Sequence, residues 1–277
     1  MGGKERQSDG SGQENPLIEE CSAGNGFPEK SPSKGNGNGN GCGCLGQGGR
    51  DRFFAIGGAI CLRVLRRSAR ISIEGLERMP RSGGCLLVSN HISHFDPILL
   101  GMESPRPIDY VADGKLFNDL ILRQILGALN VIPVDRNRQD ARAAKAAIER
   151  LKRGRIVGLF PERGIRHGKA SILLGARLSP SAAFLAQMAK APVLPAVVVG
   201  SDRLYQFRSW GRPPRVFVSF GEPLAPSPRE DRGSFTERIH GRLLSLFESL
   251  VKRYAIDPID FPHSAQERWR EEERARK

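Results

Sequence analysis

The sequence contains little cysteine, and its few cysteines form no pair with the spacing of a typical metal or redox site. Five are spread over 277 residues, without a C-x-x-C spacing. An odd, scattered set argues against a disulfide framework and against a structural zinc site, and it suits a reducing compartment. No H-E-x-x-H pattern or cluster of metal-ligand residues accompanies them. We therefore expect neither a metal nor another cofactor.

Long apolar runs are also missing. The most apolar window, residues 53–62, is ten residues long, whereas a helix that crosses a hydrocarbon core needs about twenty. The N-terminus is polar and mixed in charge, unlike a secretory signal peptide. The glycine pattern of a P-loop and the nucleophile elbow of α/β-hydrolases are absent too. We expect a protein that does not span a membrane and that uses neither of these two catalytic devices.

Acidic residues are outnumbered, and the imbalance lies in one part of the chain. Residues 1–50 carry five basic and six acidic side chains, while the remainder carries 38 basic and 24 acidic ones. Such an excess of positive charge favours an anionic partner, either nucleic acid or an anionic membrane surface. Aromatic residues make up only 6% of the chain, and no platform for stacking bases is present. We expect a membrane or a phosphorylated lipid as the partner, and no nucleic acid.

Composition divides the chain into four segments. Residues 1–50 hold 14 of the 32 glycines and are predicted to be a disordered, low-complexity tail, because they cannot bury enough surface to offset the entropy of ordering. In residues 51–70, the apolar window is followed by four arginines. This segment is predicted to form a helix that either lies in a membrane interface or packs on the protein's own core. Residues 71–265 form the main domain, and residues 266–277 a charged tail.

Within residues 71–265, stretches with strand-like and helix-like spacing alternate. This alternation predicts an α/β fold with a mainly parallel, twisted sheet and helices on both faces. Ligands of such folds bind where loops leave the carboxyl ends of the strands. The expected strands are 71–75, 85–89, 108–112, 131–134, 155–160, 193–199 and 216–220, and the expected helices are 115–126, 140–153, 180–190 and 235–254.

The most informative motif follows the strand expected at 85–89. It reads Asn-His-Ile-Ser-His-Phe-Asp over residues 90–96 and places an imidazole and a carboxylate five residues apart. Neutral imidazole can take a proton from a hydroxyl near neutral pH. A carboxylate on the other ring nitrogen fixes the tautomer and stabilises the imidazolium that forms. We predict that His91 is a general base oriented by Asp96, and that His94 lies outside this pattern.

Three further elements follow in order. They read Val-Asp-Arg over 134–136, Phe-Pro-Glu-Arg-Gly-Ile-Arg over 160–166 and Ala-Pro-Val-Leu-Pro over 191–195. Together with the first motif, they resemble the glycerolipid acyltransferase family, which includes the 1-acylglycerol-3-phosphate acyltransferases. The resemblance covers roughly residues 71–224. It implies that His91 and Asp96 form the family's His-x4-Asp pair, which activates a hydroxyl of the acceptor.

The resemblance also implies where the acceptor binds. Arg136 would hold its phosphate, which suits the planar fork of arginine, and Glu162 would orient the acceptor or a partner arginine. The third element departs from the family's usual Phe-Pro-Glu-Gly-Thr-Arg. Arg163 stands in place of the glycine, Gly164 comes one position later, and Arg166 follows the usual arginine position. Arg163 or Arg166 could still reach a phosphate.

The expected function is transfer of a fatty acyl chain from acyl-CoA or acyl-carrier protein to a lysophospholipid hydroxyl in phospholipid biosynthesis. The first choice of acceptor is 1-acylglycerol-3-phosphate, and Pro195 is expected near the acyl donor. The enzyme would work as a peripheral protein at the cytoplasmic face of the membrane. The altered third element leaves an aminolipid or glycerol 3-phosphate open as the acceptor. A basic, non-catalytic membrane-binding module is the alternative from another class.

Overall fold

The structure is a computed structural model, and it describes part of the chain. The described residues are 49, 56–57, 63, 65–101, 104–118, 131–134, 140–209, 213–258 and 261–262. The tails expected at 1–50 and 266–277 lie outside them, except for position 49, as do most of the apolar window and residues 119–126 of one expected helix. Over the described ranges, no helix is long and apolar enough to cross a membrane.

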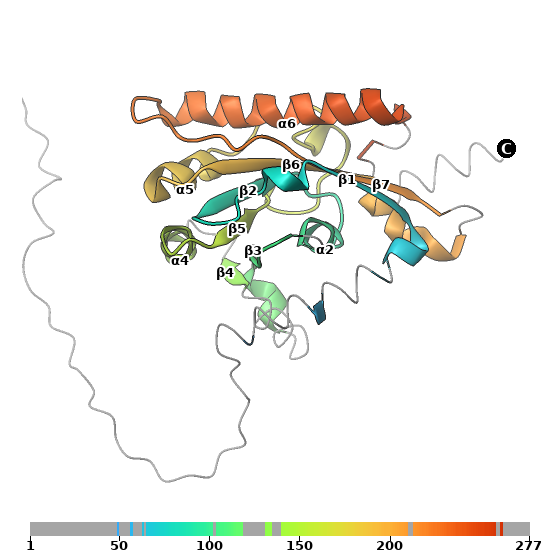
Figure 1. Cartoon of the computed structure of the whole chain (residues 1–277), viewed down its shortest axis with the longest axis horizontal. Coiled ribbons are helices and arrows are strands. Elements are labelled where there is room, and N and C mark those ends of the chain that lie inside the picture. The colour runs from blue at the N-terminus through green and yellow to red at the C-terminus, as the bar shows by residue number, and fades with distance from the viewer. Residues whose placement is uncertain are drawn as a thin grey trace, which may run out of the picture. The chain divides into compact units, whose positions relative to one another are not determined.

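A seven-stranded sheet forms the centre of the described residues (Figure 1). Its order is β1-β7-β6-β2-β5-β3-β4, and all neighbouring strands are parallel except β6 and β7. This confirms the expected α/β fold with a mainly parallel sheet. The strands are β1 (Arg70–Glu74), β2 (Cys85–Ser89), β3 (Ile108–Asp113), β4 (Ile132–Val134), β5 (Ile156–Leu159), β6 (Val193–Val199) and β7 (Arg215–Phe220).

Helices cover both faces of the sheet. On one face, α4 packs near β4 and β5, α5 over β2, and α6 along β6 and β7, as Figure 1 shows for the long α6. The other face carries α2 and the helical residues 65–68. The helices are α2 (Asp96–Gly101), α4 (Ala141–Lys152), α5 (Ser181–Ala189) and α6 (Arg232–Tyr254), with short 3-10 helices η1 (Leu76–Arg78), η2 (Gly114–Asn118), η3 (Gly168–Ala170) and η4 (Ser201–Ser209).

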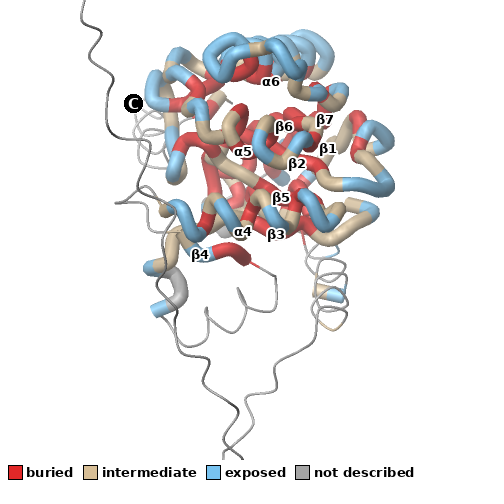
Figure 2. Tube along the Cα trace, turned by 90° about the vertical axis from the view of Figure 1, so that its left-hand side faces the viewer, coloured by how far each residue is buried: buried red, intermediate tan, exposed pale blue. Residues whose placement is uncertain are grey.

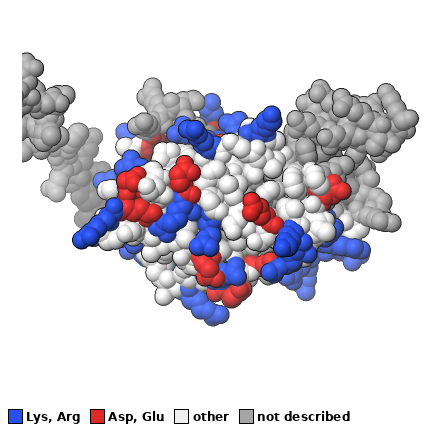
Figure 3. All heavy atoms as spheres, turned by 90° about the horizontal axis from the view of Figure 1, so that it is seen from above, with Lys and Arg blue, Asp and Glu red and all other residues white. Residues whose placement is uncertain are grey.

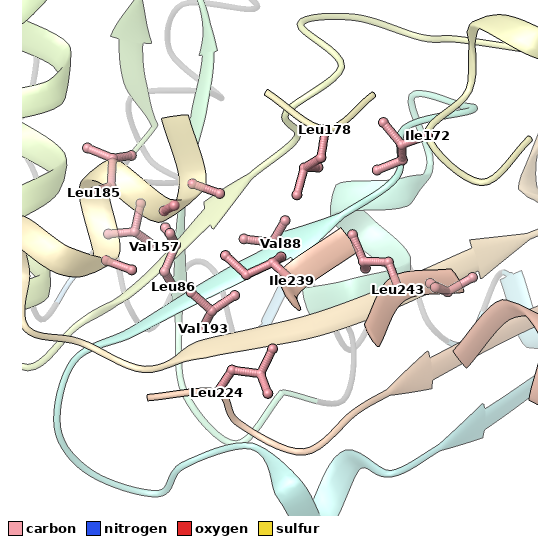
Figure 4. Packing of buried hydrophobic residues seen from close by; sticks show 14 of the residues in the cluster. Leu86, Val88, Val157, Ile172, Leu178, Leu185, Val193, Leu224, Ile239 and Leu243 are labelled. Atoms are coloured by element: carbon pink, nitrogen blue, oxygen red, sulfur yellow. The ribbon is translucent and has the colours of Figure 1, made fainter. Parts of the chain in front are cut away.

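The core lies between the sheet and these helices, and the central strands β2 and β6 are buried throughout (Figure 2). Successive side chains of β6 point to opposite faces. Val193 and Val197 join the cluster beneath α4, α5 and α6, part of which is drawn in Figure 4. Leu194 and Val198 join the cluster on the α2 face. Burial on both faces explains why β6 reads as a continuous apolar run rather than as an alternating one.

The last turn of the segment predicted at 51–70 packs on the domain. Leu65 and Ala69 are buried in the cluster on the α2 face, whereas Arg66 and Arg67 are exposed. This end of the segment therefore contributes to the core of the domain, and the interfacial helix expected at 51–70 stays a prediction. Ile56, the one described large apolar side chain of the window, is 63% exposed.

Two helices differ from the expected pattern because polar residues form the part that the apolar spacing does not predict. α6 begins at Arg232, not at 235, since the Asp231 side chain caps it by accepting a hydrogen bond from the Ser234 N–H at 3.0 Å. Its polar first turn carries no apolar spacing. The sequence pattern also does not predict η4, because its residues are mostly polar and lack a sustained run of apolar side chains at helical spacing.

Candidate active site

Three strands end close together at one edge of the sheet. β2 pairs in parallel with β5 on one side and with β6 on the other, so their carboxyl ends meet. His91 follows β2, Glu162 follows β5, and Ser201 follows β6. The sheet topology therefore brings together residues that lie far apart in the chain, at the edge where parallel sheets bind ligands.

His91 and Asp96 form a hydrogen-bonded pair. Nδ1 of His91 lies 2.9 Å from Oδ2 of Asp96. Because an ionised carboxylate can only accept, Nδ1 carries the hydrogen in this arrangement, and Nε2 of the neutral ring keeps its lone pair. The His91 side chain is 12% exposed, whereas that of Asp96 is fully buried. The pair has the geometry of a general base and its orienting carboxylate.

Asp96 is surrounded by donors. Its Oδ2 also accepts hydrogen bonds from the N–H groups of Ile92 and Ser93, at 2.7 and 2.8 Å. Its Oδ1 accepts one from the hydroxyl of Ser201 at 2.5 Å. A buried carboxylate needs such donors, because an unpaired charge away from water is very costly. The loop thus wraps around the carboxylate and fixes its plane.

Asn90 joins the start of this loop to the neighbouring strand. Its Nδ2 donates to the carbonyl of Val198 at 2.8 Å, and its Oδ1 accepts from the N–H of the same residue at 2.9 Å. The side-chain amide thereby mimics a backbone pair beyond the end of β2. Asn90 is fully buried, so it supports the loop and does not face a substrate.

The Glu162 carboxylate holds the backbone of the first motif. Its Oε2 accepts from the N–H of His91 at 2.5 Å, and its Oε1 accepts from the Ser171 hydroxyl and the Ile172 N–H at 3.1 and 2.8 Å. Burial raises the pKa of Glu162 to about 7, although all three donors oppose the rise. With three donors on it, this carboxylate holds the His91 main chain, and its implied role in orienting the acceptor or a partner arginine stays a prediction.

Arg166 completes a clamp around His91. Its N–H donates to the carbonyl of His91 at 2.8 Å. Its Nε donates to the carbonyl of Glu162 at 3.3 Å. Both polar groups of the His91 main chain are therefore bound by the third motif, and Asp96 binds the ring.

Aromatic rings support the imidazole from one side. Phe160 stacks on His91 with the ring centroids 4.3 Å apart, and Tyr110 stacks on Phe160 at 5.9 Å. The Tyr110 hydroxyl donates to the carbonyl of Pro97 at 2.8 Å. Gly158 makes room for the Tyr110 ring, because a Cβ at this position would lie 2.5 Å from two of the ring carbons. The row of rings limits how far His91 can tilt.

Arg163 adopts the left-handed backbone conformation, with φ of 57°. This is the position at which the family's usual motif has glycine. Left-handed geometry is costly for any residue with a Cβ, so the glycine of the usual motif suits this backbone. The side chains of Arg163 and Arg166 are exposed, and Gly164 between them is half-buried. Two guanidinium groups thus lie on the loop that holds His91.

Pro195 occupies a core position within β6. Its carbonyl accepts from the N–H of Gly221 at 2.8 Å. A Cβ on Gly221 would lie 2.9 Å from both the Pro195 ring and Leu246 of α6. Pro195 therefore fills space beneath α6, and its expected place near the acyl donor stays a prediction. Arg136 lies outside the described residues, so its implied contact with a phosphate stays a prediction.

His94 has a partner of its own. Its N–H donates to the Tyr205 hydroxyl at 2.7 Å, and its Nδ1 lies 2.5 Å from the same oxygen. Tyr205 also contacts Phe95, with the ring centroids 5.3 Å apart. His94 thus ties the loop to η4 and is separate from the His91–Asp96 pair.

Several residues that contact the 91–96 loop, or the rings that support it, lie in no short motif. Ser201 and Tyr205 come from η4, and Tyr110 comes from β3. Ser201 and Tyr205 contact residues 91–96, whereas Tyr110 contacts Phe160 and Pro97. These contacts depend on which strands are neighbours, which periodicity does not reveal. For Ser201, one signal was available: it is a polar residue that follows a buried strand at the predicted ligand-binding edge.

Comparisons with known proteins agree with this architecture. The sequence model of the family described as Acyltransferase matches residues 70–199. A 1-acyl-sn-glycerol-3-phosphate acyltransferase of Bacillus subtilis is 29% identical over 194 residues, which cover 68% of this chain and 93% of that protein. One of Streptococcus pneumoniae is 25% identical over 181 residues, 64% of each chain.

A solved structure has a similar fold. It is the 1-acyl-sn-glycerophosphate (LPA) acyltransferase PlsC from Thermotoga maritima, with a TM-score of 0.56 and 21% identity. The match covers 72% of this chain and 78% of that one. The family match spans β1 to β6, including the His91–Asp96 pair and the Glu162 loop. Over these residues the chain is therefore similar to the acyltransferase family, and it shares the fold of the solved acyltransferase.

Proposed function

We propose that this protein is an O-acyltransferase that moves a fatty acyl chain from a thioester, acyl-CoA or acyl-carrier protein, to the hydroxyl of 1-acylglycerol-3-phosphate. The observation that carries the proposal is the 2.9 Å contact between Nδ1 of His91 and the buried carboxylate of Asp96. The relatives named for this activity support the choice of substrate. No covalent acyl-enzyme is required.

The reaction needs one base and one leaving group. Nε2 of His91 takes the proton of the acceptor hydroxyl while its oxygen attacks the thioester carbonyl. Asp96 stabilises the imidazolium that forms, as the carboxylate of a catalytic triad does. The carbon–sulfur bond then breaks, and the departing thiolate takes the proton from the imidazolium. The ester and the free thiol leave, and His91 is neutral again.

The acceptor's phosphate is assigned to the arginines at the same edge. Arg163 and Arg166 are exposed on the loop that clamps His91, and arginine binds phosphate through two parallel hydrogen bonds. Arg136 would join them from the end of β4. Because Arg163 replaces the usual glycine, glycerol 3-phosphate or an aminolipid is retained as the alternative acceptor.

The enzyme is proposed to reach its lipid substrate as a peripheral protein on an anionic, cytoplasmic membrane face. The chain carries a formal net charge of +13. Arg63, Arg66, Arg67 and Arg70 are exposed next to the apolar window. Cations near an anionic surface each contribute about 1 kcal/mol of binding.

The direct test measures thiol release from a long-chain acyl-CoA and from acyl-carrier protein with a panel of acceptors. 1-Acylglycerol-3-phosphate should give the highest kcat/KM, glycerol 3-phosphate and aminolipids less. His91→Ala should lose at least about a hundredfold in rate, the usual scale for loss of a general base. His94→Ala, the matched control, should lose little.

Two outcomes would contradict the proposal. A folded His91→Ala variant with nearly wild-type turnover would remove the base assignment. Absence of turnover with every acceptor, together with vesicle binding that does not depend on His91, would favour the non-catalytic membrane-binding module.

A further inference from the structure

Ser201 touches the side of Asp96 that His91 does not. The His91 ring and the N–H groups of Ile92 and Ser93 all bind Oδ2. Oδ1 receives the Ser201 hydroxyl, at 2.5 Å. Ser201 and Asp96 are both fully buried, so bulk water does not compete for this bond. The serine is 105 residues from Asp96 in sequence and reaches it only because β6 neighbours β2.

We propose that Ser201 is a positioning residue of the proposed acyl transfer, which acts through Asp96 by donating to Oδ1 and so tuning how strongly the His91–Asp96 pair binds a proton. This inference rests on the proposed function of the same site. A donor on Oδ1 draws negative charge away from Oδ2, the oxygen that faces the imidazole. Hydrogen bonds to a charged group are about twice as strong as neutral ones, and strongest where water is excluded.

Loss of this hydrogen bond should change the proton affinity of the pair in one definite direction, which can be tested. Without the hydroxyl, the negative charge of Asp96 concentrates on Oδ2, and the pair holds a proton more tightly. The base would then stay protonated to a higher pH, where it cannot accept the proton of the acceptor. Loss of Ser201 should therefore shift the part of the acidic kcat/KM limb that belongs to this pair upward, by roughly half a pH unit to one unit. The other titratable or charged residues beside the pair are Glu162, whose pKa is about 7, Tyr110 and Arg166, and Ser201 is hydrogen-bonded to none of them.

If Ser201 only held η4 in place, any substitution that loosens η4 from the loop would shift the acidic limb by the same amount. Tyr205, on the same helix η4, binds the N–H and ring of His94 at 2.7 and 2.5 Å and does not touch Asp96. Tyr205→Phe therefore loosens η4 from the loop without changing the carboxylate. Ser104→Ala removes a half-buried hydroxyl that donates to the Arg106 carbonyl at 2.5 Å, away from the site. It controls for loss of a serine hydroxyl as such.

The experiment compares the full-length wild type, Ser201→Ala, Ser201→Thr, Tyr205→Phe and Ser104→Ala. The kcat/KM profile is measured with acyl-CoA and 1-acylglycerol-3-phosphate. Ser201→Ala should shift the acidic limb upward. At a pH on that limb, kcat should fall by up to about tenfold with little change in KM, because a shift of one unit changes the neutral fraction of the base by that factor. Ser201→Thr retains the hydroxyl and should return the limb to its wild-type position. The other two variants should leave it in place.

A second measurement does not need turnover. Titration of the His91 ring by ¹⁵N NMR, assigned with His91→Gln, should give a midpoint that is higher in Ser201→Ala by the same amount. An unchanged midpoint in a folded Ser201→Ala variant overturns the inference, as does an equal shift in Tyr205→Phe. If the wild type turns over no acceptor while the midpoint still shifts, the proposed function fails and the coupling of Ser201 to the pair stands.

Discussion

At the residue scale, Arg163 has a strained backbone conformation, because its φ of 57° lies in the left-handed region, which is unfavourable for a residue with a Cβ. Replacing it with glycine should raise the free energy of unfolding by about 0.5–1 kcal/mol, the strain relieved less the entropy that glycine adds to the unfolded chain. Urea denaturation measures the change. Arg166→Gly, on the same loop but absent from the positive-φ positions, should destabilise the protein. A loss of stability in Arg163→Gly would show that its side chain makes a compensating contact.

Glu162 should make stability depend on pH. Burial raises its pKa from 4.5 to about 7, so the folded state binds this proton more tightly than the unfolded chain does. The resulting stability is complete below the ordinary pKa and is lost as the pH rises through 7. The free energy of unfolding should therefore fall between about pH 5 and about pH 8, with this group contributing on the order of 1–3 kcal/mol.

Glu162→Gln tests this dependence, because glutamine does not titrate. Its free energy of unfolding, measured in urea at both pH values, should lack the part of the fall that Glu162 provides. Glu237→Gln, at an exposed position on α6, serves as the control and should keep the wild-type dependence. Equal pH dependence in all three proteins would show that Glu162 does not carry the effect.

At the scale of elements, the stack of Phe160 on His91 depends on Gly158. This glycine of β5 leaves room for the ring of Tyr110, which lies opposite it on the neighbouring strand β3. A Cβ at Gly158 would lie 2.5 Å from the ring. Gly158→Ala should therefore displace the stacked rings, cost about 1–3 kcal/mol of stability by overpacking, and lower kcat.

Gly241→Ala is the matched control for this prediction. Gly241 lies on α6 at an exposed position, and nothing within 4 Å would contact its Cβ. Alanine there should raise stability by about 0.5–1 kcal/mol, the usual gain in a helix interior, and leave kcat unchanged. Thermal unfolding and steady-state kinetics of both variants decide the matter. Tolerance of Gly158→Ala would mean that the ring can move without disturbing His91.

At the scale of the whole molecule, charge should direct membrane binding. Figure 3 shows that one face of the protein, the face on which α6 lies, mixes Lys and Arg with Asp and Glu. Arg66 and Arg67, by contrast, lie in an exposed run of arginines beside the apolar window. Binding to vesicles should rise with anionic lipid and fall with salt, because charges further apart than about 10 Å are screened at 0.1 M.

Charge reversal locates the surface. Arg66→Glu with Arg67→Glu should lower partitioning into anionic vesicles by roughly tenfold or more, at about 1 kcal/mol for each cation lost. Arg242→Glu with Lys252→Glu, an equal change of charge at exposed positions of α6, should have less effect. Sedimentation with vesicles measures both. Substitution is preferable to deletion of this segment, because Leu65 and Ala69 are buried in the core. Equal losses would mean that net charge, not this segment, sets the affinity.

The α/β class, most strand positions and the His91–Asp96 pair could be predicted from the sequence alone, because these features depend on neighbours along the chain. Alternating apolar runs define strands and helices, and five residues are few enough for a loop to return a carboxylate to an imidazole. The same local reasoning missed η4 and the polar first turn of α6, whose residues have no apolar spacing.

Tertiary structure alone decided the partners of this pair. Ser201 reaches Asp96, and Glu162 reaches the His91 N–H, because β6 and β5 flank β2. It also decided that Glu162 serves the backbone and that Pro195 belongs to the core. Strand order is set by how whole helices and strands bury their apolar faces together, and this global packing leaves no signature in the spacing of any single motif.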